Sequence, residues 1–114
     1  MISQTLAQEV SLLEADLCYA LADPTRILIL YSLDEQPRNV TELTNEIGLS
    51  QPTISRHLKV LRDRGLVNSA RQGTTITYQI ADKRLIQALD LLRSVLRDRI
   101  VHNANLMDEI EAIA

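Results

Sequence analysis

The stretch GLSQPTISRHLKVLRDRGLV, residues 48–67, constrains the fold more than any other part of the chain. It opens with a glycine, continues with a serine that can cap a helix and a proline suited to a first helical turn, and closes with a second glycine. Serine is favoured directly before a helix, proline inside its first turn, and glycine directly after its end. The sequence therefore predicts a helix over about residues 51–64, bounded by tight turns.

The predicted helix has two chemically different faces. At about 100° per residue, its large apolar side chains fall on one side and most of its polar side chains fall opposite. The apolar side comprises Ile54, Leu58 and Leu61, and the opposite side comprises Pro52, Arg56, Lys59 and Asp63. The apolar face is predicted to pack against a core, and the polar face is predicted to be exposed to solvent or a binding partner.

Two further helices are predicted near the start of the chain. The first covers about residues 4–20, because leucine and valine recur there at helical spacing. The second has Asp23 as its N-cap and Pro24 at its first position, and it runs through Leu33. Its sequence, RILILYSL, is apolar nearly all round, which predicts a buried helix at the centre of the core.

Asn39 and Glu42 have the spacing of a capping box and predict a short helix that ends at Gly48. The chain therefore places two short helices on either side of a Gly-Leu-Ser turn, and the second presents basic side chains from its first turns. This is the helix-turn-helix arrangement, whose second helix fits the major groove of DNA.

Residues 66–80 alternate in the manner of β-strands around a turn formed by Gln72, Gly73 and Thr74. They predict a β-hairpin in which Gly73 takes the positive φ that such a turn needs. A hairpin directly after a recognition helix is a wing. We expect Arg71, Gln72 and Thr74 to reach phosphates or the minor groove beside the helix.

A last helix is predicted over about residues 82–112, although Asn103 and Asn105 are poor helix formers and allow a break. A helix of this length extends ~45 Å, too far to be covered by so small a domain. We expect a homodimer in which this helix and the 4–20 helix form a two-fold interface and hold two recognition helices ~34 Å apart. The apolar stripe behind this prediction comprises Leu85, Leu89, Leu92, Leu96, Ile100, Met107 and Ile110.

The formal charge of -3 is unevenly distributed along the chain. Residues 1–49 carry two basic and eight acidic side chains, residues 50–79 carry five and one, and residues 80–114 carry five and six. The whole positive excess therefore lies in the segment of the helix-turn-helix and the hairpin. An anionic partner is attracted there, while the acidic remainder reduces nonspecific affinity.

Length and composition exclude several classes of protein. The 114 residues predict one domain, 1–114, without a membrane segment or leader, and hence a cytoplasmic protein. One cysteine excludes an internal disulfide framework and a zinc finger. Trp and Phe are absent, which disfavours stacking of single-stranded bases and favours duplex DNA. No nucleophile and base form a recognisable constellation, so we expect no enzyme activity.

Three segments, ALADPTRILILYSL, VTELTNEIGLSQPTISRHLKVLRDRGLV and RQGTTITYQI, resemble the ArsR/SmtB family of prokaryotic winged-helix repressors. The resemblance covers roughly residues 10–98. It implies a mainly α fold of four helices, a β-hairpin wing and a fifth helix, with homodimerisation through the first and last helices and operator binding that an effector releases. Family positions that meet bases or phosphates fall on Gln51, Pro52, Ser55 and Arg56. Geometry and charge add Lys59 and Arg71, and Thr53, His57, Gln72 and Thr74 complete the predicted DNA-binding set.

The resemblance ends where the metal chemistry of the family lies. Thr44 and Glu46 occupy the places of the paired thiolates of its arsenic and cadmium sensors. In its zinc and nickel sensors an Asp and a His stand two residues apart in the last helix, whereas here the residue two places after Asp98 is Ile100. Asp98 and His102 are therefore weak candidates for a metal site, and no cofactor is predicted.

Two interpretations stay open. Cys18 is either an inert packing thiol or a redox switch, because one cysteine per chain can form a disulfide across a two-fold axis. The redox-responsive members of the family use two cysteines, so Cys18 cannot form their bridge within one subunit. The winged helix is either a reader of double-stranded DNA or a module for protein contacts alone. The sequence favours a sequence-specific regulator of transcription, a repressor by resemblance, although the residues leave activation open. Its effector is a metal, an oxidant or a small ligand, or it has none.

Overall fold

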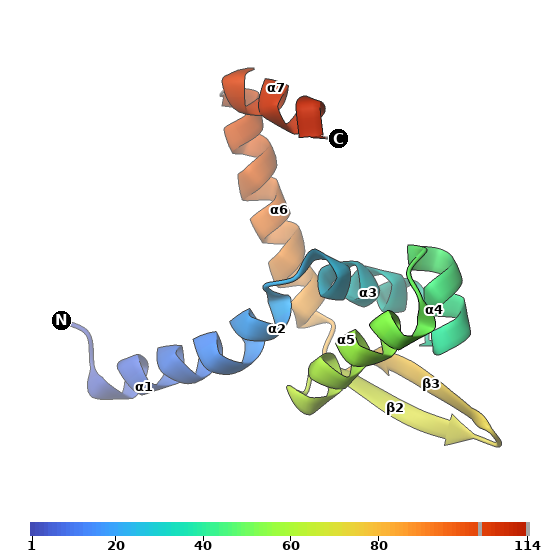
Figure 1. The fold of residues 1–114 in the computed structure, drawn as a ribbon. Helices are drawn as coiled ribbons and strands as arrows, with labels where there is room; N and C mark the ends of the chain where they lie inside the picture. The colour runs from blue at the N-terminus through green and yellow to red at the C-terminus, as the bar shows by residue number, and fades with distance from the viewer. Residues whose placement is uncertain (103, 114) are drawn as a thin grey trace. The chain divides into compact units, whose positions relative to one another are not determined.

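A computed structural model describes residues 1–102 and 104–113 (Figure 1). The chain forms two compact units, Met1–Lys83 and Arg84–Ala114. The first holds α1 (Gln4–Leu13), a π-helical turn η1 (Glu14–Cys18), α2 (Tyr19–Leu21), α3 (Pro24–Glu35), β1 (Arg38–Asn39), α4 (Val40–Ile47), α5 (Gln51–Asp63), β2 (Val67–Gln72) and β3 (Thr75–Ile80). The second holds α6 (Arg84–His102) and α7 (Ala104–Ile113). The predicted class, mainly α with a β-hairpin, is confirmed.

Helix α3 lies at the centre of the core of the first unit, as its apolar sequence predicts. Its Ile29, Leu30 and Leu33 are buried, and it contacts α4, α5 and β3. The burial is not uniform around the helix, because its neighbours leave Leu28 55% exposed. The rest of this core comprises Ala20, Leu43, Ile54, Leu58, Leu61, Leu66 and Val67.

Asp23 caps α3 as predicted. Its Oδ1 accepts hydrogen bonds from the backbone N–H groups of Thr25 at 2.8 Å and Arg26 at 3.3 Å. Burial raises the pKa of the Asp23 carboxyl, but these two hydrogen bonds and the charges of His57 and Arg26 outweigh it and hold the pKa below its ordinary value of 3.8. The folded chain therefore favours the ionised carboxylate.

Because the pKa of Asp23 is lower in the folded chain, its ionised form stabilises the fold above the ordinary pKa, and this stabilisation is lost as pH falls through the folded value. We expect Asp23→Ala to lower the free energy of unfolding at pH 7 by about 1 kcal/mol. Asp23→Asn keeps a capping oxygen without titrating, so it should lose less stability than the natural chain below about pH 4. Urea unfolding at pH 7 and pH 3 measures both effects, and equal acid sensitivity of the natural chain and Asp23→Asn would contradict the assignment.

The capping box predicted at the start of α4 is present. The Asn39 N–H donates to Glu42 Oε1 at 3.0 Å, and the Glu42 N–H donates to Asn39 Oδ1 at 2.8 Å. Gly48 ends the helix with φ 83°, in the left-handed region that glycine enters without a steric penalty. Both ends of α4 are thus set by local sequence, which fixes where the turn to α5 begins.

Helix α5 ends in a Schellman motif. The Leu66 N–H donates to the Leu61 carbonyl at 2.8 Å, and the N–H of Gly65, which has φ 80°, donates to the Arg62 carbonyl at 3.0 Å. Leu61 and Leu66 are both fully buried. The motif therefore anchors the end of α5 in the core and leads the chain directly into β2.

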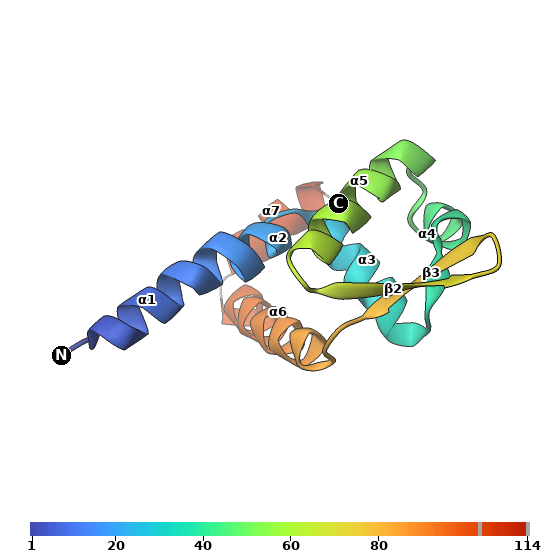
Figure 2. The same cartoon turned by 90° about the horizontal axis from the view of Figure 1, so that it is seen from below.

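The predicted hairpin is confirmed as β2 and β3. Gln72 pairs with Thr75, so Gly73 and Thr74 form a two-residue turn. Of these two residues only Gly73 has a positive φ, 63°, as a type II′ turn requires. The turn matches the twist of the two strands, which lets them project as a wing (Figures 1 and 2).

Strand β1 was not predicted. Its Arg38 and Asn39 pair with Tyr78 and Thr77 of β3, giving a three-stranded antiparallel sheet of order β1-β3-β2. Two residues are too few to show strand alternation, and the pairing depends on β3, which lies far along the chain. Tertiary contact, rather than local sequence, therefore makes this strand.

The predicted 4–20 helix is present but is not continuously α-helical. Helix α1 ends at Leu13, and the hydrogen bonding passes through the π-helical turn Glu14–Cys18 before α2. A π turn takes in an extra residue, which rotates every later side chain by about 100° around the helix axis. No side chain of residues 1–19 is buried, whereas Ala20 is fully buried.

The structure describes two helices over residues 82–112, where the sequence predicted one helix and allowed a break at Asn103 and Asn105. Helix α6 ends at His102 and α7 begins at Ala104, close to the asparagines at which a break was allowed; Asn103 itself and the side chain of Met107 lie outside the described residues. Helix α6 has an exposed apolar surface made of Leu91, Leu92, Val95, Leu96 and Val101. None of the described helices is long and apolar enough to cross a membrane.

Candidate nucleic-acid interface

Helix α5 presents a polar and basic face next to the turn from α4. Its opposite face, Ile54, Leu58 and Leu61, is at most 1% exposed and holds it on the core. The hairpin β2–β3 follows directly from its C-terminal end (Figure 2). The helix-turn-helix and wing predicted from the sequence are therefore present. Exposed residues on α5 include Gln51, Pro52, Ser55, Arg56, Lys59 and Arg62.

The first turn of α5 has no side-chain cap on its backbone N–H groups. Ser50 holds the N-cap position, but its hydroxyl lies 2.9 Å from the hydroxyl of the half-buried Thr53. Arg56 Nη2 reaches the same Thr53 hydroxyl at 3.5 Å, which is long for a hydrogen bond. The positive end of the helix dipole and a loosely held guanidinium thus lie together at the start of this helix, which suits an anionic ligand.

Two basic residues of this segment already have partners within the chain, Lys59 inside α5 and Arg64 at the N-terminal helix. Lys59 Nζ forms an ion pair with Asp63 Oδ2 at 3.0 Å, and both side chains are exposed, so the pair is weak. Arg64 Nη1 donates to the Ala15 carbonyl at 2.6 Å and lies 3.1 Å from Asp16 Oδ1. Arg64 therefore faces the N-terminal helix and does not add to the basic face that the charge count indicated.

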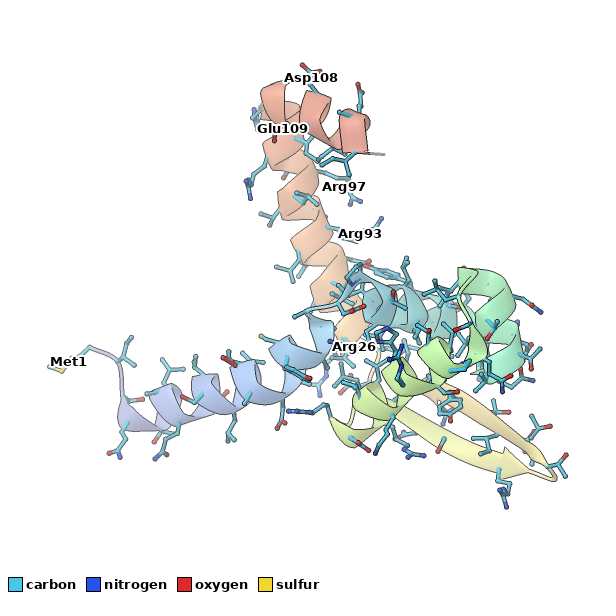
Figure 3. The ribbon with its side chains drawn as sticks, viewed as in Figure 1. Met1, Arg26, Arg93, Arg97, Asp108 and Glu109 are labelled. Atoms are coloured by element: carbon cyan, nitrogen blue, oxygen red, sulfur yellow. The ribbon has the colours of Figure 1, made fainter. Side chains whose placement is uncertain are left out.

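His57 is half-buried at the edge of α5 and faces the scaffold. Its Nδ1 lies 3.3 Å from Arg26 Nη1. Arg26 also donates from Nε to the Ala20 carbonyl at 2.7 Å and from Nη2 to the Tyr19 carbonyl at 3.1 Å (Figure 3). Sequence reasoning missed Arg26, whose signal is a single basic residue at the start of an otherwise apolar helix. The contacts of His57 favour a supporting role over a DNA contact.

The three residues predicted for the wing, Arg71, Gln72 and Thr74, are all exposed. Arg71 pairs with Ile76 and Gln72 with Thr75, so both lie in the last pairs before the turn. Both residues therefore lie near the tip of the hairpin, next to Thr74 in the turn.

The predicted metal and redox candidates do not form a site within the chain. Asp98 and His102 are exposed on α6, and the described residues contain no group of three or more His, Cys, Asp or Glu able to hold a metal ion. The hydroxyl of Thr44 is buried without a hydrogen-bond partner, whereas Glu46 is exposed. Cys18 is a free and exposed thiol.

Residues 23–69 match the family described as bacterial regulatory protein, arsR family. The chain is 42% identical over 88 residues to the HTH-type transcriptional regulator NmtR of Mycobacterium tuberculosis, and the match covers 77% of this chain and 69% of NmtR. The chain belongs to the arsR family. It is also 41% identical over 70 residues to the repressor SmtB of the same organism, which covers 61% of this chain and only 52% of SmtB. The chain thus spans about half of that relative.

Solved structures agree with this assignment. NolR from Sinorhizobium fredii is 34% identical, with a TM-score of 0.73 over 83% of this chain and 94% of NolR. A homodimeric winged helix-turn-helix DNA-binding domain from Mycobacterium bovis, described as a possible ArsR-family regulator, is 28% identical, with a TM-score of 0.75 over 90% of this chain and 94% of that domain. This arsR-family chain is a winged helix-turn-helix transcriptional regulator, and the resemblance seen in the sequence is confirmed. Its named relatives are regulators rather than enzymes.

Proposed function

We propose that this regulator is a homodimeric repressor that binds double-stranded operator DNA and leaves it when an effector arrives. Helix α5 enters the major groove, and the hairpin lies against the flanking backbone. The observation that carries the proposal is the exposed basic face of α5, which begins directly after the Gly48–Ser50 turn, in a chain whose other segments are acidic. Such a distribution concentrates affinity for phosphate on one surface.

The first turns of α5 read base edges in this proposal. Arg56 has the planar fork that forms two hydrogen bonds with O6 and N7 of guanine, and Gln51 has the amide that recognises adenine in the same way. Lys59 contacts phosphate after releasing Asp63. The proposed contacts are Gln51, Pro52, Thr53, Ser55, Arg56 and Lys59 in α5 and Arg71, Gln72 and Thr74 in the wing, with His57 supporting α5.

The proposed dimer interface is built from α1 and α6, each of which carries apolar side chains that the chain itself leaves in water. On α1 these are Leu6, Val10 and Leu13, and each is at least 46% exposed. On α6 they include Leu92, Val95 and Leu96, each at least 47% exposed. Apolar patches of this extent mark contact surfaces, and the homodimeric M. bovis domain supports a second copy as the partner.

Three classes of effector fit the chain. An oxidant can act on the exposed thiol of Cys18, a metal can bind a site completed by the second subunit, and a small apolar ligand can bind at the dimer interface. The name of one relative, a probable mercury resistance operon repressor of Streptomyces lividans that is 37% identical over 79 residues, refers to a metal for that protein. The thiolate positions of the family are Thr44 and Glu46 here, which argues against a soft metal at α4.

Fluorescence anisotropy with DNA from upstream of the gene of this chain tests the proposal. Phosphate contacts by four to six basic groups per complex predict that log affinity falls with log salt at a slope of about -4 to -5. A complex with weak salt dependence, or none on any upstream fragment, would favour a winged helix used for protein contacts. Repeating the titration after mild oxidation tests whether Cys18 is a redox switch. If oxidation abolishes DNA binding and reductant restores it, Cys18 is the residue that controls binding.

Arg71→Ala should weaken binding to all DNA sequences about equally and reduce the salt slope by about 2, because each Arg71 of the proposed dimer contacts one backbone phosphate. The measurement compares operator and scrambled duplexes at several salt concentrations. Gln79→Ala, at an exposed position of β3 away from the tip, is the control and should bind as the natural chain does. A loss confined to one base-pair position would show instead that Arg71 reads sequence.

A further inference from the structure

Two arginines from different helices contact one aromatic ring. The Cζ atoms of Arg64 and Arg26 lie 4.5 Å and 5.7 Å from the centroid of the Tyr19 ring, both within the range of about 6 Å over which a cation is attracted to a ring face. Arg26 belongs to α3, and Arg64 is the C-cap residue of α5. Tyr19 is 51% exposed, so burial alone does not explain its position.

The same two guanidinium groups bind carbonyls near the end of the N-terminal helix. Arg64 Nη1 donates to the Ala15 carbonyl, and Arg26 donates to the carbonyls of Tyr19 and Ala20. The last carbonyls of a helix form the negative end of its dipole, so cations bind there favourably, although the Tyr19 carbonyl also accepts from the Ala22 N–H at 3.2 Å. The π-helical turn next to Tyr19 rotates this ring away from the phase of α1.

These contacts determine how α1 is attached to the reading helix. Since no side chain of residues 1–19 is buried, the direction of α1 depends on the buried Ala20 and on the two arginines. Arg26 reaches His57 in the middle of α5, and Arg64 stands at its end. The end of the N-terminal helix is thereby linked to α5 at two points, through Arg26 and His57 and through Arg64.

We propose that Tyr19 is a positioning residue for DNA reading, which acts by fixing α1 to α5 through Arg26 and Arg64. We name Tyr19, Arg26 and Arg64 the Tyr19 clamp. The inference rests on the proposed function, in which α1 contributes to the dimer interface and α5 reads the operator. The clamp then sets the separation of the two reading helices of the dimer, which must match half-sites one helical turn apart.

Operator binding by Tyr19 variants tests the clamp. Tyr19→Leu removes the ring but keeps an apolar side chain, and we expect specific affinity to fall about three- to tenfold, with unchanged affinity for scrambled duplex and an unchanged salt slope. Tyr19→Phe keeps the ring and both arginine contacts, so it should bind as the natural chain does. An equal loss of affinity for operator and scrambled duplex would overturn the proposal. A reading helix in the wrong position loses its contacts with bases but keeps its nonspecific contacts with phosphate.

Arg64 variants separate geometry from charge. Arg64→Gln and Arg62→Gln each remove one positive charge from the last part of α5, but only Arg64 belongs to the clamp. We expect Arg64→Gln to lose as much operator specificity as Tyr19→Leu, Arg62→Gln to lose none, and the double variant Tyr19→Leu, Arg64→Gln to lose no more than either single change. Additive losses would show that Tyr19 and Arg64 act separately and would overturn the clamp.

A distance measurement decides the clamp without DNA. Spin labels at residues 8 and 62, in a full chain carrying Cys18→Ser and diluted with unlabelled protein, report the separation of α1 and α5 within one subunit. We expect one narrow distance in the parent and a broad distribution after Tyr19→Leu, and an unchanged distribution would overturn the inference. If the natural chain binds no duplex, the proposed function is wrong, but the distance between residues 8 and 62 still tests the clamp.

Discussion

Replacement of Arg56 by alanine is expected to reduce specific operator binding by about 1–3 kcal/mol, which is about fivefold to a hundredfold or slightly more. The guanidinium is exposed on the second turn of α5 and is held by the Thr53 hydroxyl only at 3.5 Å. Arg56 therefore loses little free energy when it leaves the Thr53 hydroxyl and forms two hydrogen bonds with a guanine. Anisotropy titrations with the operator and with single base-pair variants measure the loss.

Arg62→Ala is the matched control for Arg56→Ala. It removes the same charge from an exposed position on α5, but at about 100° per residue its side chain leaves the helix about 120° away from that of Arg56. We expect a small loss that is equal for all sequences. If Arg56→Ala gives the same small and uniform loss, Arg56 contacts backbone phosphate and the base-reading assignment fails.

A carboxylate in the apolar surface of α6 is expected to have the largest effect of all. In the proposed dimer, Leu92→Glu buries one new negative charge from each subunit near the two-fold axis, and an unpaired buried charge costs several kcal/mol. We expect sedimentation at micromolar concentration to show monomers, and operator affinity to fall at least about a hundredfold because two half-sites can no longer be held together. Leu92 is 63% exposed in the single chain, so the subunit itself should stay folded.

Gln87→Glu adds the same charge to an exposed position of α6, about 140° around the helix from Leu92. It should leave both dimerisation and DNA binding unchanged. A dimeric Leu92→Glu protein would remove this face of α6 from the interface. Dissociation by both variants would point to the total charge of α6 rather than to a specific apolar contact.

Local sequence predicted the elements that have local causes. The caps at Asp23 and Asn39 and the glycines at 48, 65 and 73 each have a short-range physical reason, and each lies where the sequence predicted it. The packing face of α5 follows in the same way from the helical repeat. The basic exposed face and the wing were therefore predictable, and the family assignment confirms the fold that they imply.

The errors lie where distant residues decide the outcome. Helical periodicity predicted a uniform α-helix over residues 4–20, but a π turn occupies Glu14–Cys18, where Arg64 from far along the chain binds the Ala15 carbonyl. The separation of α6 from α7 has, by contrast, a local cause that the sequence allowed for, because Asn103 and Asn105 are poor helix formers. The charge count included Arg64 in the basic segment, but a count contains no direction, and this residue contacts the N-terminal helix.

The sequence by itself determined where the turns fall, which face of α5 packs, where positive charge gathers and to which family the chain belongs, because caps, glycines and apolar repeats act over a few residues. Only the tertiary structure decided that β1 joins the sheet, that His57 and Arg64 face the scaffold, and that two arginines contact the ring of Tyr19. These contacts join residues up to 49 positions apart. Such pairings depend on the packed core, which brings distant side chains within hydrogen-bonding range.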